Sequence, residues 1–224
     1  MKKFTLLFIS LILSICSLGF IGCKNTSTLE NSLSELRYAL YEGQVDDYLL
    51  KASYGFKESE YSNDGKVGKK IYLLSFSLLG KETDDKTYYI TFEHDGKCFE
   101  GQFKLSPTRH VLTCQFEIDD FNEQSFSAKV GLIDDKKDVA FNSVIPKGTL
   151  SYKQALDCLE KKQSSLLENY KDSDGNFNAE IYQRIIVKDG KAYWYIGIAN
   201  GNGRLKALLI DGKTGEVLAT REVF

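Results

Sequence analysis

The feature that most constrains the fold is an alternation of apolar and polar residues that runs from Val45 to Pro146. Successive side chains of a β-strand point to opposite faces, so a period of two indicates strands with one buried face. The clearest case is Tyr88–Leu105, where Asp95-Gly96 separates two alternating runs. Asp-Gly at this point predicts a two-residue type I′ hairpin turn. The resulting register pairs three sets of apolar positions on one face: Phe92 with Phe99, Ile90 with Gly101, and Tyr88 with Phe103.

Five more runs in this region are predicted strands, namely Tyr48–Phe56, Ile71–Leu79, Val111–Ile118, Phe126–Ile133 and Val139–Ile145. Ile71–Leu79 is apolar on both faces apart from Ser75 and Ser77, which suits a central strand. Short strands at this spacing are typical of a sandwich. The chain is also rich in Phe and Tyr and has only 2 Pro, which suits sheets. We therefore expect residues 44–146 to form an antiparallel β-sandwich of about seven strands, immunoglobulin-like in arrangement.

Two segments have a helical period instead. Ser27 and Glu30 have the spacing of a capping box, and four leucines then share one helical stripe: Leu29, Leu33, Leu36 and Leu40. Residues 23–43 are therefore predicted to be a tether followed by a short helix. Ser151 and Gln154 form a second capping box, which begins a predicted helix to about residue 170. Pro146-Lys147-Gly148 is the predicted boundary between two domains.

Four alternating runs follow the polar loop Asp172–Asn178: residues 180–188, 191–199, 205–210 and 216–222. Asp189-Gly190 predicts another tight hairpin, which pairs Val187 with Ala192 and Ile185 with Trp194. Residues 149–224 are thus expected to place one helix on a small antiparallel sheet, which gives the whole chain an α+β class.

Three features in order resemble a PepSY domain over residues 151–219. They are the helix containing Ala155-Leu156, the run Tyr193–Ile196, and the turn Asp211-Gly212-Lys213-Thr214-Gly215-Glu216-Val217. The resemblance implies a small, non-catalytic extracytoplasmic module of a kind often associated with regulation or inhibition of peptidases. It implies no catalytic residue.

The N-terminal residues have the layout of an export signal. Lys2 and Lys3 precede an apolar stretch, Phe4–Ile21, and small Gly22 then precedes Cys23. Phe20-Ile21-Gly22-Cys23 resembles the lipobox of bacterial lipoproteins. This implies that residues 1–22 are a lipoprotein signal peptide and that acyl chains such as palmitate on Cys23 hold the protein to a membrane of the cell envelope, on its extracytoplasmic side. An uncleaved membrane anchor and simple cleaved secretion remain open alternatives.

Charge and motifs indicate no nucleic-acid partner, no cofactor and no enzymatic site. The formal net charge is −2 and the basic residues are scattered, so the chain lacks the basic patch that nucleic acid requires. Metalloprotease, Cys-x-x-Cys, phosphate-loop and nucleophile-elbow motifs are all missing. His94 and His110 are expected to be solvated. The hairpin register sets Cys98 against Glu93 and His94 against Lys97, so the thiol lacks an activating base.

Other polar clusters have simpler interpretations. Asp172, Asp174 and Asn176 alternate as oxygen donors, which leaves calcium binding open, although Phe177 stands where an EF-hand needs glycine. Cys98 is expected to point outward and Cys114 inward, which disfavours a disulfide between them. Cys158 is expected to be a packing residue at the edge of a helical stripe.

The candidate binding surface is a set of side chains on the sheet face opposite Trp194: Tyr182, Arg184, Tyr193 and Tyr195. This face either stays open and binds a partner or packs on the sandwich. The preferred hypothesis is a membrane-anchored, non-catalytic lipoprotein that binds proteins or peptides. The alternatives are a glycan- or cell-wall-binding lipoprotein and a hydrolase that uses a carboxylate pair such as Asp46-Asp47.

Overall fold

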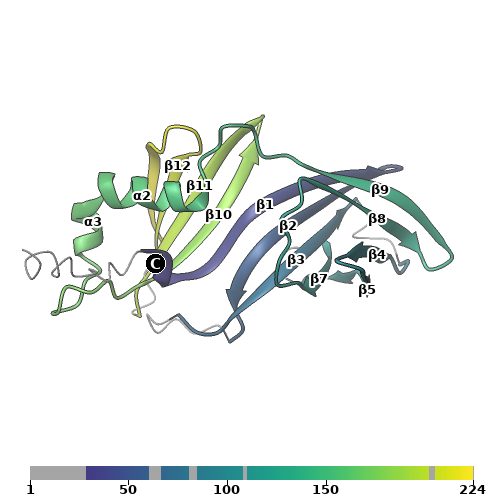
Figure 1. The fold of residues 1–224 in the computed structure, drawn as a ribbon, viewed down its shortest axis with the longest axis horizontal. Helices are drawn as coiled ribbons and strands as arrows, with labels where there is room; N and C mark the ends of the chain where they lie inside the picture. The colour runs from purple at the N-terminus through teal and green to yellow at the C-terminus, as the bar shows by residue number, and fades with distance from the viewer. Residues whose placement is uncertain (1–28, 61–66, 81–84, 108–109, 202–204, 224) are drawn as a thin grey trace, which may run out of the picture.

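The computed structural model describes residues 29–60, 67–80, 85–107, 110–201 and 205–223 (Figure 1). Strands account for 58% and helices for 11% of it, and 13 strands form one sheet that is almost entirely antiparallel. The predicted α+β class, with an immunoglobulin-like sandwich followed by a helix-plus-sheet layout, is therefore wrong. The sheet curls on itself until it is nearly closed.

The elements follow one another as a long series of strands interrupted by two helices. The first strands are β1 (Leu33–Val45), β2 (Tyr48–Glu58), β3 (Lys70–Leu79), β4 (Tyr89–His94), β5 (Lys97–Gln102), β6 (Lys104–Leu105), β7 (Leu112–Glu117), β8 (Ser125–Leu132) and β9 (Asp135–Ser143). The C-terminal part has helices α2 (Tyr152–Lys162) and α3 (Ser164–Glu168), then β10 (Glu180–Lys188), β11 (Lys191–Ala199), β12 (Leu205–Asp211) and β13 (Val217–Val223). A single 3-10 turn, η1 (Leu29–Ser32), precedes β1.

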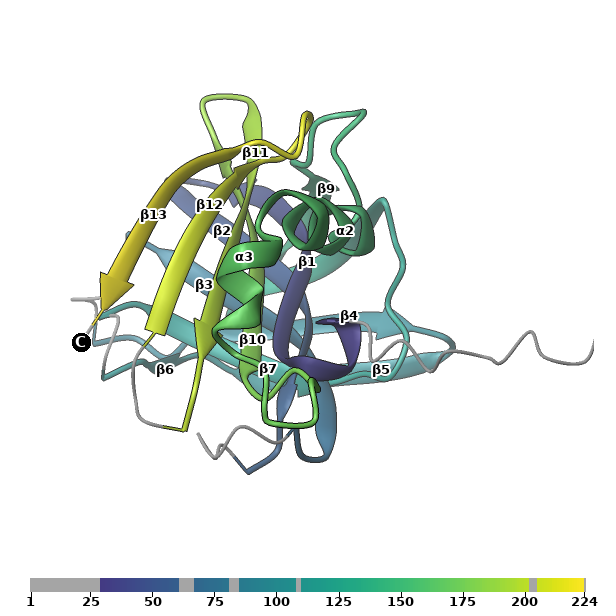
Figure 2. The same cartoon turned by 90° about the vertical axis from the view of Figure 1, so that its left-hand side faces the viewer.

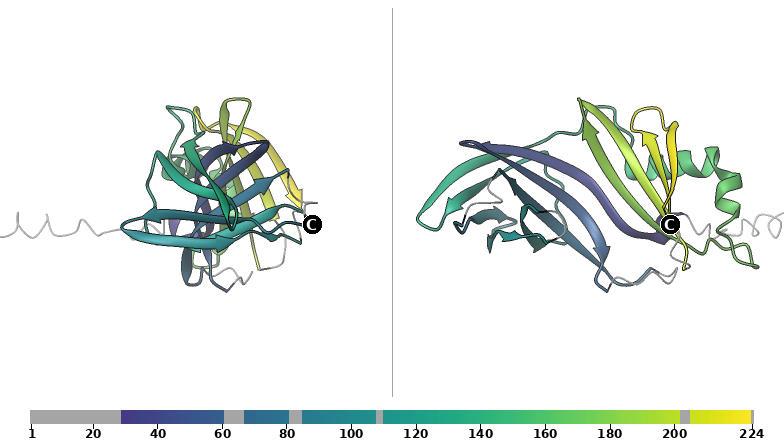
Figure 3. Two further views of the ribbon diagram at one scale, coloured as in Figure 1. Left: turned by 90° about the vertical axis from the view of Figure 1, so that its right-hand side faces the viewer. Right: turned by 180° about the vertical axis from the view of Figure 1, so that it is seen from behind.

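Strand β1 is the branch point of the sheet. One path runs β13-β12-β11-β10-β1-β2-β3-β7-β6, and a second leaves β1 through β9, β8 and β4 to β5. β1 pairs with β2 along most of its length, with β10 in parallel over Leu33–Arg37, and with β9 at Tyr41 and Glu42. Seen from behind, the sheet bends at β1, with β2 on one side and β10 on the other (Figure 3). Both halves of the molecule are therefore built on the same strand.

The predicted helix over residues 29–43 is wrong, because β1 occupies most of it. Register shifts between Leu33 and Glu35 and between Arg37 and Ala39 interrupt the strand alternation. These irregularities move buried side chains from one face to the other, so the leucines acquire a helix-like spacing. Pairing with β2 and β10 satisfies the backbone groups that a helix would have bonded internally.

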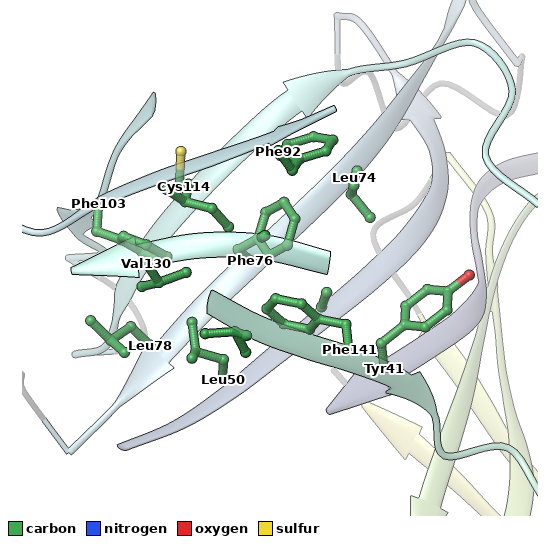
Figure 4. Packing of buried hydrophobic residues seen from close by; sticks show 14 of the residues in the cluster. Tyr41, Leu50, Leu74, Phe76, Leu78, Phe92, Phe103, Cys114, Val130 and Phe141 are labelled. Carbon is green, nitrogen blue, oxygen red and sulfur yellow. The ribbon is translucent and has the colours of Figure 1, made fainter. Parts of the chain in front are cut away.

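The N-terminal half, β1–β9, buries a core made largely of aromatic rings. Phe76 is fully buried and lies between Phe92 and Phe141, with ring centroids 5.6 Å and 5.5 Å away (Figure 4). Such tilted and edge-to-face pairs each contribute roughly 0.5–1.5 kcal/mol beyond the burial of their area. The sheet closes around this core where β5 approaches β7: a Cβ on Gly101 would lie 2.6 Å from Cys114 Sγ, so only glycine fits there.

The C-terminal half buries its core beneath helices instead. Figure 2 shows α2 and α3 lying across the sheet that contains β10–β12. Trp194 is 1% exposed, and its indole N–H donates to the Leu150 carbonyl over 3.0 Å. Leu33, Leu36 and Phe56 also belong to this core, although they precede the predicted domain boundary. The capping box of Ser151 and Gln154 is confirmed.

Both predicted hairpins are confirmed. Asp95 and Gly96 have φ of 50° and 71°, as a type I′ turn requires, and Asp189 and Gly190 have φ of 50° and 70°. The predicted pairs are observed: Phe92 with Phe99, Ile90 with Gly101, Val187 with Ala192, and Ile185 with Trp194. Turn chemistry and the burial of one face therefore determine these registers together.

Candidate functional site

The four residues of the predicted binding surface do share one sheet face. Tyr182 and Arg184 on β10 lie beside Tyr193 and Tyr195 on β11, on the side away from the helices. Tyr182 is nevertheless buried, and its hydroxyl donates to the Glu180 carboxylate. Tyr193 and Tyr195 are half-buried. The accessible part of this face is therefore smaller than the sequence pattern suggests.

Arg184 forms an ion pair with a residue of the segment that is predicted to be helical. Its Nη2 lies 2.6 Å from Oε2 of Glu35 on β1, and the other carboxylate oxygen of Glu35 lies 2.8 Å from Arg37 Nε. Glu35 is only 8% exposed. This ion-pair cluster lies where β10 joins β1, so Arg184 helps to hold the two halves together.

Strands β4 and β8 part at the end of the molecule away from the helices (Figure 1). The two strands pair from Tyr89 opposite Gly131 to Phe92 opposite Ala128, and no further. Beyond that point β4 stays with β5 and β8 stays with β9. A depression of about 460 Å³ occupies the fork, and we call it the fork depression. Its volume is within the range of ordinary ligand sites.

Three aromatic residues form the apolar part of the fork depression. Phe92 comes from β4, Phe126 from β8, and Phe121 from the loop that joins β7 to β8. Phe121 and Phe126 meet edge to face, with centroids 5.0 Å apart at 88°. Phe126 is half-buried, whereas the other two are almost fully buried. An apolar side chain entering from outside would thus meet rings that are already fixed by packing.

The loop carrying Phe121 is fastened on both sides. Tyr41, which is 2% exposed, donates its hydroxyl hydrogen to the Glu123 carbonyl over 2.7 Å. Burial raises the pKa of Tyr41 to about 12, so its hydroxyl remains a donor well above neutral pH. On the other side, His94 Nε2 lies 2.6 Å from the Asp120 carbonyl oxygen, and the imidazole ring is 4.9 Å from Phe121.

This arrangement corrects the expectation that His94 is a solvated turn residue. Its side chain is only 10% exposed, because the ring packs on Phe121 and hydrogen-bonds to the loop backbone. The pairing of Cys98 with Glu93 and of His94 with Lys97 is confirmed. Cys98 is exposed on the rim of the fork depression with a free thiol, and Cys114 is free and buried.

The rim of the fork depression is acidic. Glu93, Glu123 and Asp138 line it against a single cation, Lys129. None of these three carboxylates lies within 4.0 Å of a cationic group of another described residue. The rim therefore presents carboxylates that are open to a charged partner.

The other predicted features of the described residues lie outside the fork depression. Asp172 Oδ1 accepts hydrogen bonds from the backbone N–H groups of Asp174 and Asn176, at 3.0 Å and 2.8 Å, so this carboxylate closes its own loop. The described residues contain no group of three or more His, Cys, Asp or Glu side chains placed to hold a metal ion. No helix in the described part has the length and apolar character needed to cross a bilayer. Cys23, the predicted lipidation site, lies outside the described residues.

Comparison of the chain with protein-family models, with curated proteins and with solved structures gives no match. The PepSY and lipobox resemblances accordingly remain predictions from the sequence.

Proposed function

We propose that this protein is a lipid-anchored, extracytoplasmic binding module whose fork depression receives part of a protein or peptide. One observation carries the proposal: an apolar depression opens where two paired strands separate, so an open strand edge and buried rings occur at one place. Strand addition uses such an edge for main-chain hydrogen bonds and nearby pockets for alternate side chains. An extended peptide has both the main-chain groups that can bond to the strand edge and the side chains that can enter the depression.

The filled core supports a ligand at the rim rather than one deep inside the sheet. The space between Phe76, Phe92 and Phe141 is occupied by their own rings. The fork depression instead lies where the curl of the sheet is interrupted. A ligand there would contact the outer surface and the ends of two strands, which is the geometry of a protein or peptide contact.

The anchor is the second part of the proposal. Acylation of Cys23 would leave a short polar connection before Leu29, where the described fold begins. Such a connection spans on the order of 20 Å when extended, so the folded part would stay near the bilayer. A role in regulating peptidases, which the PepSY resemblance implies, belongs to this proposal as one class of partner.

The test uses Cys98 as a native reporter. Displayed random peptides are selected on the purified protein, and the rate of Cys98 labelling by a fluorescent maleimide is then measured with and without each selected peptide. We expect selected peptides to slow the labelling, because Cys98 lies on the rim of the fork depression. The Cys98→Ser variant gives the background from the other thiols.

Two results would overturn the proposal for this site. One is a selection that enriches no peptide. The other is a set of enriched peptides that bind equally well after a bulky adduct has been attached to Cys98. For the anchor, a Cys23→Ala variant that still incorporates labelled palmitate would contradict acylation at that thiol.

A further inference from the structure

We infer that the fork depression binds a positively charged, extended segment, added as a strand to β8, with a large apolar side chain between basic residues. This inference rests on the proposed function and specifies the chemistry of the partner. The hydrogen-bond register of β8, the two faces of the fork and the charge of its rim support it.

The register shows which backbone groups of β8 face the fork. The N–H of Ser143 donates to the carbonyl of Gln124, so residues 124 and 126 direct their backbone groups toward β9. In an antiparallel ladder the intervening residues point the other way, which aims the backbone groups of Ser125 and Ser127 at the fork. The β4–β8 ladder ends at the non-hydrogen-bonded pair of Phe92 and Ala128, which uses the Ser127 carbonyl, so the N–H of Ser127 and both backbone groups of Ser125 remain available. No described strand pairs with Ser125 or Ser127 on this side, since the pairing of β4 with β8 ends at Phe92 and Ala128. An extended segment can bond to these groups.

The two faces of the fork call for alternating side chains. Phe126 and Ala128 point into the core, whereas Ser127 and Lys129 point outward. Successive side chains of an added strand would therefore alternate between the aromatic interior and the outer rim. A large apolar side chain fits the interior beside Phe92, Phe121 and Phe126, and its neighbours meet the outer rim.

The charge of the rim selects those neighbours. Glu93 and Asp138 lie on the outer side of the fork, and Glu123 lies at its loop end. Against the one positive charge of Lys129, these carboxylates leave an excess of negative charge that attracts Lys or Arg. If a second copy of this chain met the same edge about a two-fold axis, the rim carboxylates of the two copies would face and repel each other, which argues against self-association there.

The test compares three short peptides that differ only in charge. Each carries one Phe flanked by two Lys, two Gln or two Glu, with neutral ends, and its affinity is measured by fluorescence polarisation on the full-length protein. We expect the lysine peptide to bind about tenfold more tightly than the glutamate peptide, and the difference to shrink with added salt.

Variants separate the charge from the backbone contribution. Glu93→Gln combined with Asp138→Asn should remove most of the preference for lysine, whereas Glu160→Gln, an exposed carboxylate on α2 at the opposite end of the molecule (Figure 1), should retain it. Ser127→Pro removes the N–H aimed at the fork without removing a β8–β9 bond, so it should weaken all three peptides. Ser127→Ala keeps that N–H and should bind more tightly than Ser127→Pro. Circular dichroism verifies the fold of each variant.

The outcomes distinguish the inference from the proposed function. Equal binding of the three peptides, with protection of Cys98, would overturn the basic partner and leave the proposed function standing. Unchanged binding to Ser127→Pro would overturn strand addition. Selection of other peptides that protect Cys98, while the lysine peptide does not, would also refute the inference alone. Failure of every peptide to protect Cys98 would overturn both.

Discussion

The two halves of the molecule bury the inner face of one sheet in different ways. In the N-terminal half the sheet curls so that this face encloses its own aromatic side chains. In the C-terminal half α2 and α3 pack on this face and cover it. A helix can cover the whole sheet face on which it packs, whereas a sheet that curls on itself leaves strand ends and edges that nothing covers. The fork depression lies at such an end, so closure by curling leaves an opening that closure by helices does not.

The largest effect expected in this comparison is the loss of a central ring from the curled half. Phe76→Ala should lower the free energy of unfolding by about 3–5 kcal/mol, because Phe76 is fully buried among four other rings. Chemical denaturation measures the change. Leu218→Ala on exposed β13 is the control and should change stability little. A small loss for Phe76→Ala would show that the rings do not form a tightly packed core.

The next largest effect is expected at the junction of the two halves. Glu35→Gln removes the carboxylate shared by Arg37 and Arg184 and should cost about 1–2 kcal/mol, a value reduced for the partial exposure of Arg184. Differential scanning calorimetry shows whether one transition becomes two. Glu100→Gln, which removes a more exposed pair with Lys136 in the N-terminal half, is the comparison and should cost less. Equal losses would mean that the junction has no special role.

A smaller effect is confined to the helix-covered half. Ser151→Ala removes the side chain that accepts from the Gln154 N–H and should cost about 1 kcal/mol. Hydrogen exchange should increase in α2 while the amides of β3 and β8 keep their protection. Loss of protection in β3 would instead show that the two halves unfold together.

The smallest expected effect is a loss of folding stability that is absent at neutral pH and appears only in alkaline solution. The pKa of Tyr41 is raised to about 12 in the folded state, so folding favours its protonated form. That contribution is fully present below the ordinary pKa of 10.0 and is lost as the pH rises toward 12. Unfolding measured from pH 9 upward should show the decline, and it should be shallower in Tyr41→Phe. Identical pH profiles for the two proteins would exclude Tyr41 as its source.

Local chemistry made part of this fold predictable. Asp95-Gly96 and Asp189-Gly190 determine their hairpins through positive φ, and Ser151 with Gln154 determines the start of α2. These features depend on residues within a few positions of each other. The burial of one strand face was equally visible, but a sandwich and a curled sheet share that pattern, so the choice between them could not be made from alternation.

The site depends on contacts between distant parts of the chain. Arg184 meets Glu35 only because β1 pairs in parallel with β10, a contact that spans 149 positions. The fork depression exists because β4 and β8 stop pairing at Phe92 and Ala128, and nothing near either residue marks that end. The acidic stretch Asp119–Glu123 has Phe121 inside it, but neither its charge nor its single aromatic residue predicts that it lies beside β4.

The position of β1 has a mechanical consequence. A force applied at the start of the chain enters the folded part through β1, which is bonded to β2 on one side and to β10 on the other. Pulling along the strand loads many of these bonds at once in shear rather than opening them one after another. If the protein is held by its N-terminus while a ligand pulls at the far end, the load is therefore carried by β1, the strand that is bonded on both sides.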